Sequence, residues 1–202
     1  MSFLVLGFFT GLSLIFAIGA QNIFVIEQGL KKQFVFIVCL ICAISDLLLI
    51  FLGIFLFQYF DNFFTPFIEL IFNILLLLFL LNFIWGKIKE NKKEIKIDKK
   101  NIKTSFFNTI YKTLGFTYLN PHVYSDTVFF LGNFSKNFLI SEKYLFGIGA
   151  SLSSLIFFFS LGYLSKYLSN YLKNDKIWKI INLIIILFMS CLAIYVLNNI
   201  IK

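Results

Sequence analysis

Two side-chain amides and two carboxyls lie inside stretches of sequence that are otherwise apolar. Gln21 and Asn22 follow a run of uncharged residues that begins at Met1, while Asp46 and Asp126 each lie within another apolar run. Lipid offers these groups no hydrogen-bond partner, and a carboxylate at the centre of a membrane helix costs about 2.5–3.5 kcal/mol on insertion scales. We therefore expect these side chains to face a cavity, a partner or an ion path.

The two acids have no basic partner at similar depth. Because no lysine lies in the middle of an apolar run, a cationic substrate or a proton could supply the missing charge. The alternative is that both carboxyls are protonated and only form hydrogen bonds between helices.

Asn120 and Pro121 indicate the start of a helix inside the fourth apolar run. Asn is a good N-cap, and Pro at the first helical position gives up an N–H that would have no intrahelical partner. The free N–H groups and positive end of such a half-helix suit an anion, for example an amino-acid carboxylate. A simple proline kink is the alternative. Gly19 and Ala20 mark a similar interruption in the first run.

The remaining reactive side chains give weaker signals. His122 is the only histidine, so we assign it a supporting role and expect no metal or other cofactor. Cys39 and Cys42 have CxxC spacing, which indicates either two small apolar residues or a thiol redox pair. Neither a P-loop nor a nucleophile elbow is present, so the chain is not predicted to be an enzyme.

These residues must be positioned by membrane-spanning helices. The chain is 59% hydrophobic, 20% aromatic and only 14% charged, with a mean hydropathy of +0.89, which is typical of an integral membrane protein. Stretches long enough to cross about 30 Å of hydrocarbon leave no room for a soluble domain. The six predicted spans lie near residues 3–26, 34–57, 63–85, 115–135, 144–165 and 178–200.

The lysines are distributed by side of the membrane. Fifteen of the 18 basic residues, all of them lysines, lie around the first, third and fifth loops, which the positive-inside rule places in the cytoplasm. Both termini are then outside, unless the first segment is re-entrant and leaves the N-terminus inside. The net charge of +8 therefore predicts contact with anionic lipid headgroups and not with nucleic acid.

The order of segments predicts a single all-α polytopic membrane domain over 1–202, built as two inverted three-helix repeats. Half one covers 1–86, a basic cytoplasmic loop covers 87–112, and half two covers 113–202. Helices 1 and 4 are interrupted, as in many secondary transporters. Gly29 is predicted to be a helix C-cap. Small residues suited to close helix packing are Gly7, Gly11, Gly147, Gly149, Ala150, Ser151, Ser153 and Ser154.

Three stretches carry a family resemblance. "GAQNIFVIEQGLKKQ", "CAISDLLLIFLGIF" and "LNPHVYSDTVFFLGNF", in this order, resemble the basic amino acid exporters of the LysE family. The resemblance implies a multi-pass carrier of the bacterial inner membrane that exports L-lysine or L-arginine, driven by the proton gradient or membrane potential. This chain has Ala20 where the family usually has Pro. A homodimer is left open.

Carried over to this chain, the family's functional positions fall on the polar residues above. The motif of the first helix falls on Gly19, Gln21 and Asn22. The intramembrane acids fall on Asp46, which follows Ser45 in "ISD", and on Asp126. The broken fourth helix falls on Asn120 and Pro121, followed by His122.

The resulting hypothesis is a polar cavity near the membrane midplane. The amides of Gln21, Asn22 and Asn120 would hold the zwitterionic end of the substrate, while the two acids would attract its cationic side chain or exchange a proton for it. Alternatives are an exporter of neutral amino acids such as threonine or homoserine, a membrane thiol-transfer protein, and a purely structural membrane subunit.

Overall fold

The computed structural model describes residues 2–16, 19–60, 65–92, 105–169 and 175–201. Every regular element in these ranges is helical, which confirms the all-α prediction. The elements in chain order are α1 (Phe3–Ile15), α2 (Ala20–Lys31), α3 (Val35–Phe60), α4 (Pro66–Lys92), α5 (Phe106–Tyr118), α6 (Pro121–Tyr124), the π-helical segment η1 (Ser125–Phe130), α7 (Leu131–Ser135), α8 (Ile140–Leu168) and α9 (Asp175–Ile201).

Three of the described helices are long and apolar enough to cross a membrane. They are α3 over Val35–Phe57, α4 over Pro66–Gly86, and α8. The bent pair α1 and α2 makes a fourth candidate span, whereas α9 reaches this apolarity only over the shorter Leu183–Asn198. The predicted span 115–135 is not a continuous helix, because α5 ends at Tyr118 and α6 begins at Pro121. The finding is therefore three to four candidate spans, fewer than the six predicted from the sequence.

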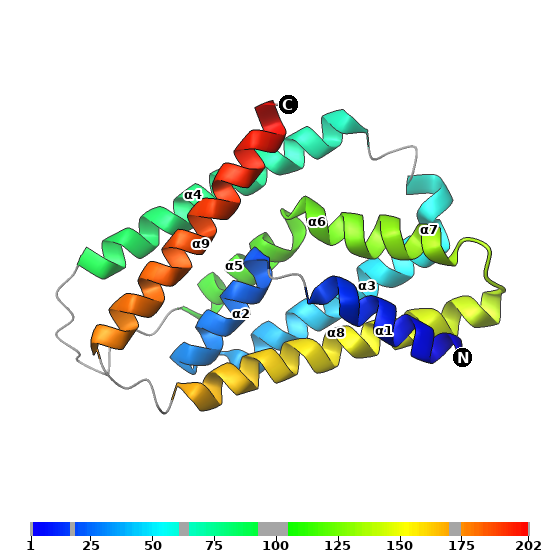
Figure 1. Ribbon diagram of the computed structural model, residues 1–202, viewed down its shortest axis with the longest axis horizontal. Helices are drawn as coiled ribbons and strands as arrows, with labels where there is room; N and C mark the ends of the chain where they lie inside the picture. The colour runs from blue at the N-terminus through cyan, green and yellow to red at the C-terminus, as the bar shows by residue number, and fades with distance from the viewer. Residues whose placement is uncertain (1, 17–18, 61–64, 93–104, 170–174, 202) are drawn as a thin grey trace.

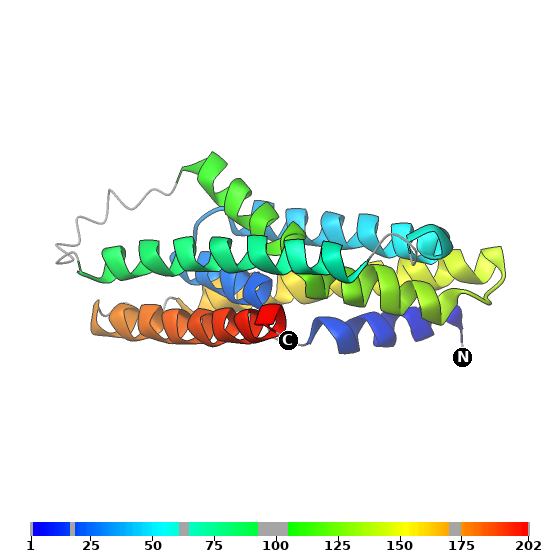
Figure 2. The same cartoon turned by 90° about the horizontal axis from the view of Figure 1, so that it is seen from above.

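The ends of the helices gather at opposite sides of the molecule. Figure 1 shows that α2, α4 and α8 end on the side where α3, α5 and α9 begin. Described lysines lie near these helix ends, among them Lys31 in α2, Lys89 in α4 and Lys166 in α8. The N-terminus, the α7–α8 connection and the start of α4 lie toward the other side. The long helices lie roughly alongside one another in the second view as well (Figure 2).

The first predicted interruption is confirmed. α1 ends at Ile15 and α2 begins at Ala20, and the two helices are bent by 83°. Gly19 is the N-cap residue of α2, with extended backbone angles. The break therefore forms with Ala20 at the first helical position, where the family resemblance implied a proline.

The second interruption is confirmed as well, and it continues in an irregular helix. The Asn120 side-chain oxygen accepts a hydrogen bond of 3.1 Å from the N–H of His122, so Asn120 is the predicted N-cap of α6. After one turn the helix widens into η1 and then returns to α-helical geometry in α7. π-Helical turns are rare in proteins, and those that do occur are often found at functional sites. Nothing in the sequence indicated this one.

Glycines allow the helices of the two halves to pack against each other closely. α1 and α3 both pack on α8, and α4 packs on α9. A Cβ at Gly7 would overlap the Phe146 carbonyl oxygen, and a Cβ at Gly149 would overlap the Leu4 carbonyl oxygen. On α3, a Cβ at Gly53 would lie 2.6 Å from Val128 Cα of η1. The predicted role in helix packing is confirmed for Gly7, Gly11, Gly147 and Gly149.

Gly29 is not a C-cap, and this prediction was wrong. α2 continues past it to Lys31, and its C-cap is Lys32 in the left-handed conformation, with φ of 56°. Gly29 instead faces α8, where a Cβ would lie 2.6 Å from the Gly162 carbonyl oxygen. The residue is small because a helix backbone passes next to it.

Close packing at these glycines leads to a stability prediction. Gly149→Ala would force α1 and α8 apart, so we expect it to lower the free energy of unfolding by about 1–3 kcal/mol. Gly86→Ala is the matched control because nothing lies within 4 Å of a Cβ there, and it should be neutral or stabilising by up to about 1 kcal/mol. Thermal unfolding in detergent measures both; equal shifts for the two variants would contradict the packing argument.

Candidate functional site

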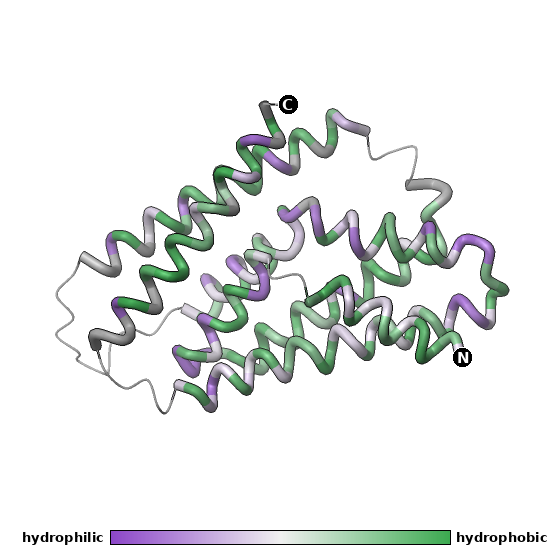
Figure 3. The backbone as a smooth tube through the Cα atoms, in the orientation of Figure 1, coloured by the Kyte–Doolittle hydropathy of each residue, from purple (hydrophilic) through white to green (hydrophobic). Residues whose placement is uncertain are grey.

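A cavity of about 510 Å³ lies where the two broken helices meet. This volume is within the range of about 300–1,000 Å³ found for small-molecule sites. Hydrophilic stretches reach the centre of the molecule where α2 and α6 begin (Figure 3). All described elements except α5 contribute to the lining, which is Gly11, Leu14, Ile15, Gly19, Ala20, Gln21, Asn22, Asp46, Ile50, Leu76, Leu80, Asn120, His122, Val123, Asp126, Thr127, Leu131, Phe158, Tyr195 and Val196.

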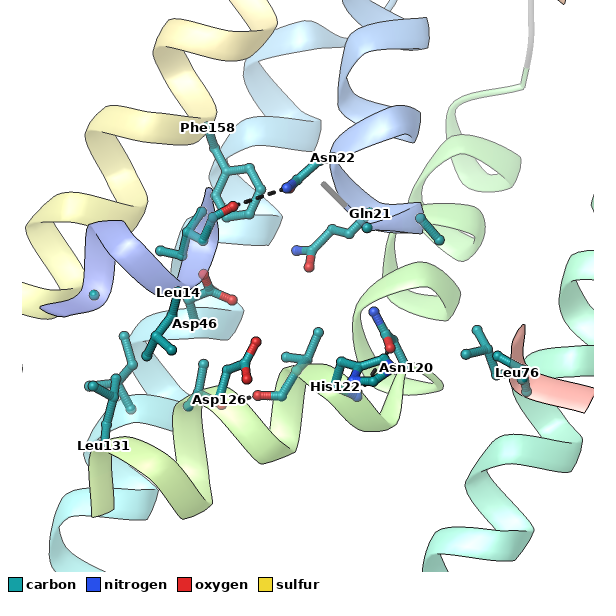
Figure 4. A pocket seen from close by; sticks show the side chains of 18 of the residues that line it. Leu14, Gln21, Asn22, Asp46, Leu76, Asn120, His122, Asp126, Leu131 and Phe158 are labelled. Atoms are coloured by element: carbon teal, nitrogen blue, oxygen red, sulfur yellow. Dashed lines mark hydrogen bonds between the residues drawn. The ribbon is translucent and has the colours of Figure 1, made fainter. Parts of the chain in front are cut away.

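The structure brings most of the expected site residues to this one cavity (Figure 4). Ser45 is buried in α3 but is not among the lining residues, and Pro121 is the first residue of α6. The expected residues that line the cavity are Gly19, Gln21, Asn22, Asp46, Asn120, His122 and Asp126.

The two carboxyls share the cavity, and no described lysine pairs with either of them. Asp46 is 3% exposed, and its Oδ2 accepts a hydrogen bond of 2.6 Å from the Ser154 hydroxyl of α8. Asp126 comes from η1 and is close enough to Asp46 to interact with it electrostatically. Among the described residues neither acid forms an ion pair. The cavity is therefore able to attract positive charge.

Ser154 contacts a candidate site residue, and sequence reasoning missed this contact. Its position in a stripe of small residues indicated packing alone, and neighbouring Ser153 does pack there, against the position of Gly11. Only the relative register of α3 and α8 places one serine of this stripe opposite Asp46, and that register cannot be predicted from one sequence.

The amides play different parts in the two helix breaks. Asn22 Nδ2 donates a hydrogen bond of 3.1 Å to the carbonyl oxygen of Ile15, and so satisfies an end group of α1 that has no intrahelical partner. Asn120 caps α6. Gln21 is 7% exposed, and its Nε2 has no hydrogen-bond partner among the described residues, although the amide lies beside the Cys42 thiol.

His122 lies at the edge of the cavity. Its side chain is exposed and stacks on Tyr195 of α9, with ring centroids 5.8 Å apart and an interplanar angle of 29°. It also interacts electrostatically with Asp126. The stacked pair is a contact between α6 and α9. No group of three metal-binding side chains occurs within the described ranges.

The apolar wall of the cavity was not predicted. Leu76 and Leu80 come from α4, and Tyr195 and Val196 come from α9. Asn73, Asn82 and Ser190 lie within the apolar stretches of these helices but do not line the cavity. The residues that do line it are mainly apolar, and an apolar lining residue has the same sequence signature as one that faces lipid. Phe158 of α8 also lines the cavity, and its carbonyl oxygen accepts a hydrogen bond of 3.2 Å from Cys39 Sγ.

Comparisons with known proteins agree on one family. The LysE type translocators match this chain over residues 12–199. The arginine exporter protein ArgO of Pectobacterium atrosepticum is 32% identical over 190 residues, covering 93% of each chain. ArgO of Pectobacterium carotovorum is 31% identical with the same coverage. ArgO of Salmonella typhimurium is 31% identical over 192 residues, covering 93% of this chain and 89% of that protein. No solved structure matches the chain significantly.

The hydrogen bond between Ser154 and Asp46 leads to a prediction for a double-mutant cycle. Ser154→Ala and Asp46→Leu each remove one partner, so their effects on the free energy of unfolding should be coupled by about 1.5–3 kcal/mol, the range for a hydrogen bond to a charged group. The control cycle uses Ser165→Ala, because the Ser165 hydroxyl bonds to the Leu161 carbonyl oxygen within α8. Coupling of equal size in both cycles would rule out a specific bond.

Proposed function

Because this chain belongs to the LysE type translocator family, we propose that it exports the basic amino acids L-arginine and L-lysine. Family membership makes it a multi-pass transporter of the inner membrane and not an enzyme. The activity for which its relatives are named, arginine export, supports the narrower substrate class.

The observation that carries this proposal is the pair of carboxyls in one cavity. Asp46 is almost completely buried, and no described lysine forms an ion pair with it or with Asp126. A buried negative charge without a partner is unfavourable, and a guanidinium or ammonium group entering the cavity would relieve that cost. A neutral amino acid would bring no net charge to offset it.

Charge balance favours exchange with protons. Moving one positive charge out of a cell against a negative interior costs about 2.3 kcal/mol per 100 mV. If a carboxyl that releases the cation outside then carries a proton inward, the cycle moves no net charge. We infer that Asp46 and Asp126 bind substrate and proton in turn.

The direction of the helices supports six crossings as two inverted halves. Along the chain, α1–α2, α4 and α8 run from the side of the N-terminus toward the lysine-rich side, and α3, α5–α7 and α9 run back (Figure 1). In this arrangement both termini are outside and the lysine-rich loops are cytoplasmic. The first segment then crosses the membrane despite its 83° bend.

Access to the cavity has to change without separating the closely packed helices. α1, α2 and α3 are held to α8 and η1 at Gly7, Gly29, Gly53 and Gly149, so the two sequence halves are interlocked. α4 and α9 pack mainly on each other and form one apolar wall. Movement of this pair relative to the remaining helices is the change that breaks the fewest close contacts.

Two other functions are distinguished by simple measurements. A neutral amino acid exporter would be inhibited by threonine or homoserine at concentrations where arginine has no effect. A thiol-transfer protein needs reactive cysteines, whereas Cys39 and Cys42 are buried as free thiols. A cysteine-free variant should therefore retain export.

Neutralising the acids tests the proposal. Asp46→Asn and Asp126→Asn should each lower export of labelled arginine from proteoliposomes by about tenfold or more, since an interaction with a charged group contributes about 1.5–3 kcal/mol. Glu142→Gln is the control, because Glu142 lies outside the cavity and accepts a hydrogen bond from the N–H of Leu139. Native export rates in both Asn variants would refute the role of the acids.

A further inference from the structure

We propose that the first turn of α2 and the Gln21 amide together bind the α-carboxylate of the exported amino acid. This inference rests on the proposed function, in which Asp46 and Asp126 attract the cationic side chain. It assigns the opposite end of the same substrate to a second part of the cavity, and it moves the carboxylate subsite from the start of α6 to the start of α2.

The start of α2 lacks a side-chain cap. The first N–H groups of an α-helix have no intrahelical acceptor, and they carry the positive end of the helix dipole. α2 has 12 residues, and its N-cap residue Gly19 makes no side-chain capping hydrogen bond. Gly19, Ala20, Gln21 and Asn22 all line the cavity. A carboxylate in the cavity would find donors of the type that bind anions at helix ends.

Gly19 is not required for packing or backbone geometry. Its φ of −107° and ψ of −177° are accessible to any residue. A Cβ there would lie 3.9 Å from Asn120 Nδ2, an ordinary contact distance, whereas a Cβ at Gly7 or Gly29 would meet backbone atoms of α8. A serine or aspartate would fit at this N-cap and would usually be preferred. The space left by the missing side chain is therefore available to a ligand.

Gln21 provides an independent indication of a ligand. It is 7% exposed, and its Nε2 has no hydrogen-bond partner among the described residues. Figure 4 shows its side chain extending from the first turn of α2 into the space that Asp46 and Asp126 also face. A buried amide N–H without an acceptor is costly. The oxygen of a bound carboxylate would satisfy it.

The start of α6 is less suitable for the carboxylate, although its sequence resembles an anion site more closely. Pro121 has no N–H, the N–H of His122 donates to the Asn120 side chain, and the N–H of Val123 donates to the Asn120 carbonyl oxygen at 3.2 Å. The donors at that break are already occupied. The two breaks thus differ. Asn120 caps the start of α6, whereas the start of α2 has no side-chain cap and can bind the substrate carboxylate.

Agmatine, which is arginine without its carboxylate, separates the two subsites. We would measure inhibition of labelled arginine export by unlabelled arginine and by agmatine in proteoliposomes. Native protein should prefer arginine by about tenfold or more, the factor for one charged hydrogen bond. Gln21→Met should raise the concentration of arginine needed for half-maximal inhibition about tenfold, and it should leave the corresponding concentration of agmatine unchanged.

Gln28→Met is the matched control. Gln28 lies on the same helix and is 3% exposed, but it is not a lining residue, so this variant should keep the native preference for arginine. Gly19→Asp is a second, independent variant. The carboxylate of the introduced aspartate would cap α2 and occupy the subsite. The apparent affinity for arginine should therefore fall at least tenfold more than the apparent affinity for agmatine.

The outcomes separate this inference from the proposed function. The inference is overturned if arginine export depends on Asp46 while Gln21→Met and Gly19→Asp both keep the native ratio of arginine to agmatine affinity. It is also overturned if both variants weaken the two compounds equally. Failure of the native protein to export arginine at all would instead refute the proposed function. If Gln21→Met does not fold, as judged by thermal unfolding, the ratio in Gly19→Asp decides.

Discussion

A helix that stops inside a membrane exposes backbone polar groups that lipid cannot satisfy, and the arrangement of the site depends on this constraint. The chain contains two such breaks and places them next to each other. At the first, Asn22 donates to the carbonyl oxygen of Ile15; at the second, Asn120 accepts from the N–H of His122. Both breaks open onto one cavity. The polar backbone is therefore shielded from lipid by the helices around it, and the same helices enclose the candidate site.

The acids follow from the same arrangement. Asp46 can remain in α3 because it faces the cavity and receives a hydrogen bond from Ser154 across the helix interface. Glycines bring the helices close enough for such contacts, since a Cβ at Gly53 would lie 2.6 Å from the Cα of Val128, which follows Asp126 by two residues in η1. Packing and chemistry are thus linked: the interlocked halves fix the positions of both carboxyls, and the less strongly attached pair of α4 and α9 completes the cavity.

Local signals in the sequence were sufficient for the breaks and for the polar residues around them. Asn before Pro identified the start of α6, and an unpaired acid in an apolar run predicted an internal site for Asp46. What depends on helix register could not be predicted: the Ser154 contact, the packing role of Gly29, the π-helical turn and the apolar wall. Gly29 looked like a C-cap because glycine serves both purposes. Likewise, two polar amides side by side did not reveal that Asn22 is used by the protein whereas Gln21 Nε2 has no partner among the described residues.

The most direct test of the central claim, that the cavity between the two breaks holds a cationic amino acid, is an experimental structure with L-arginine bound in lipid nanodiscs. This account predicts the guanidinium group within hydrogen-bonding distance of Asp46 or Asp126, and the carboxylate at the first turn of α2. Arginine bound outside this cavity, or bound within it with its guanidinium group away from both acids, would contradict the account.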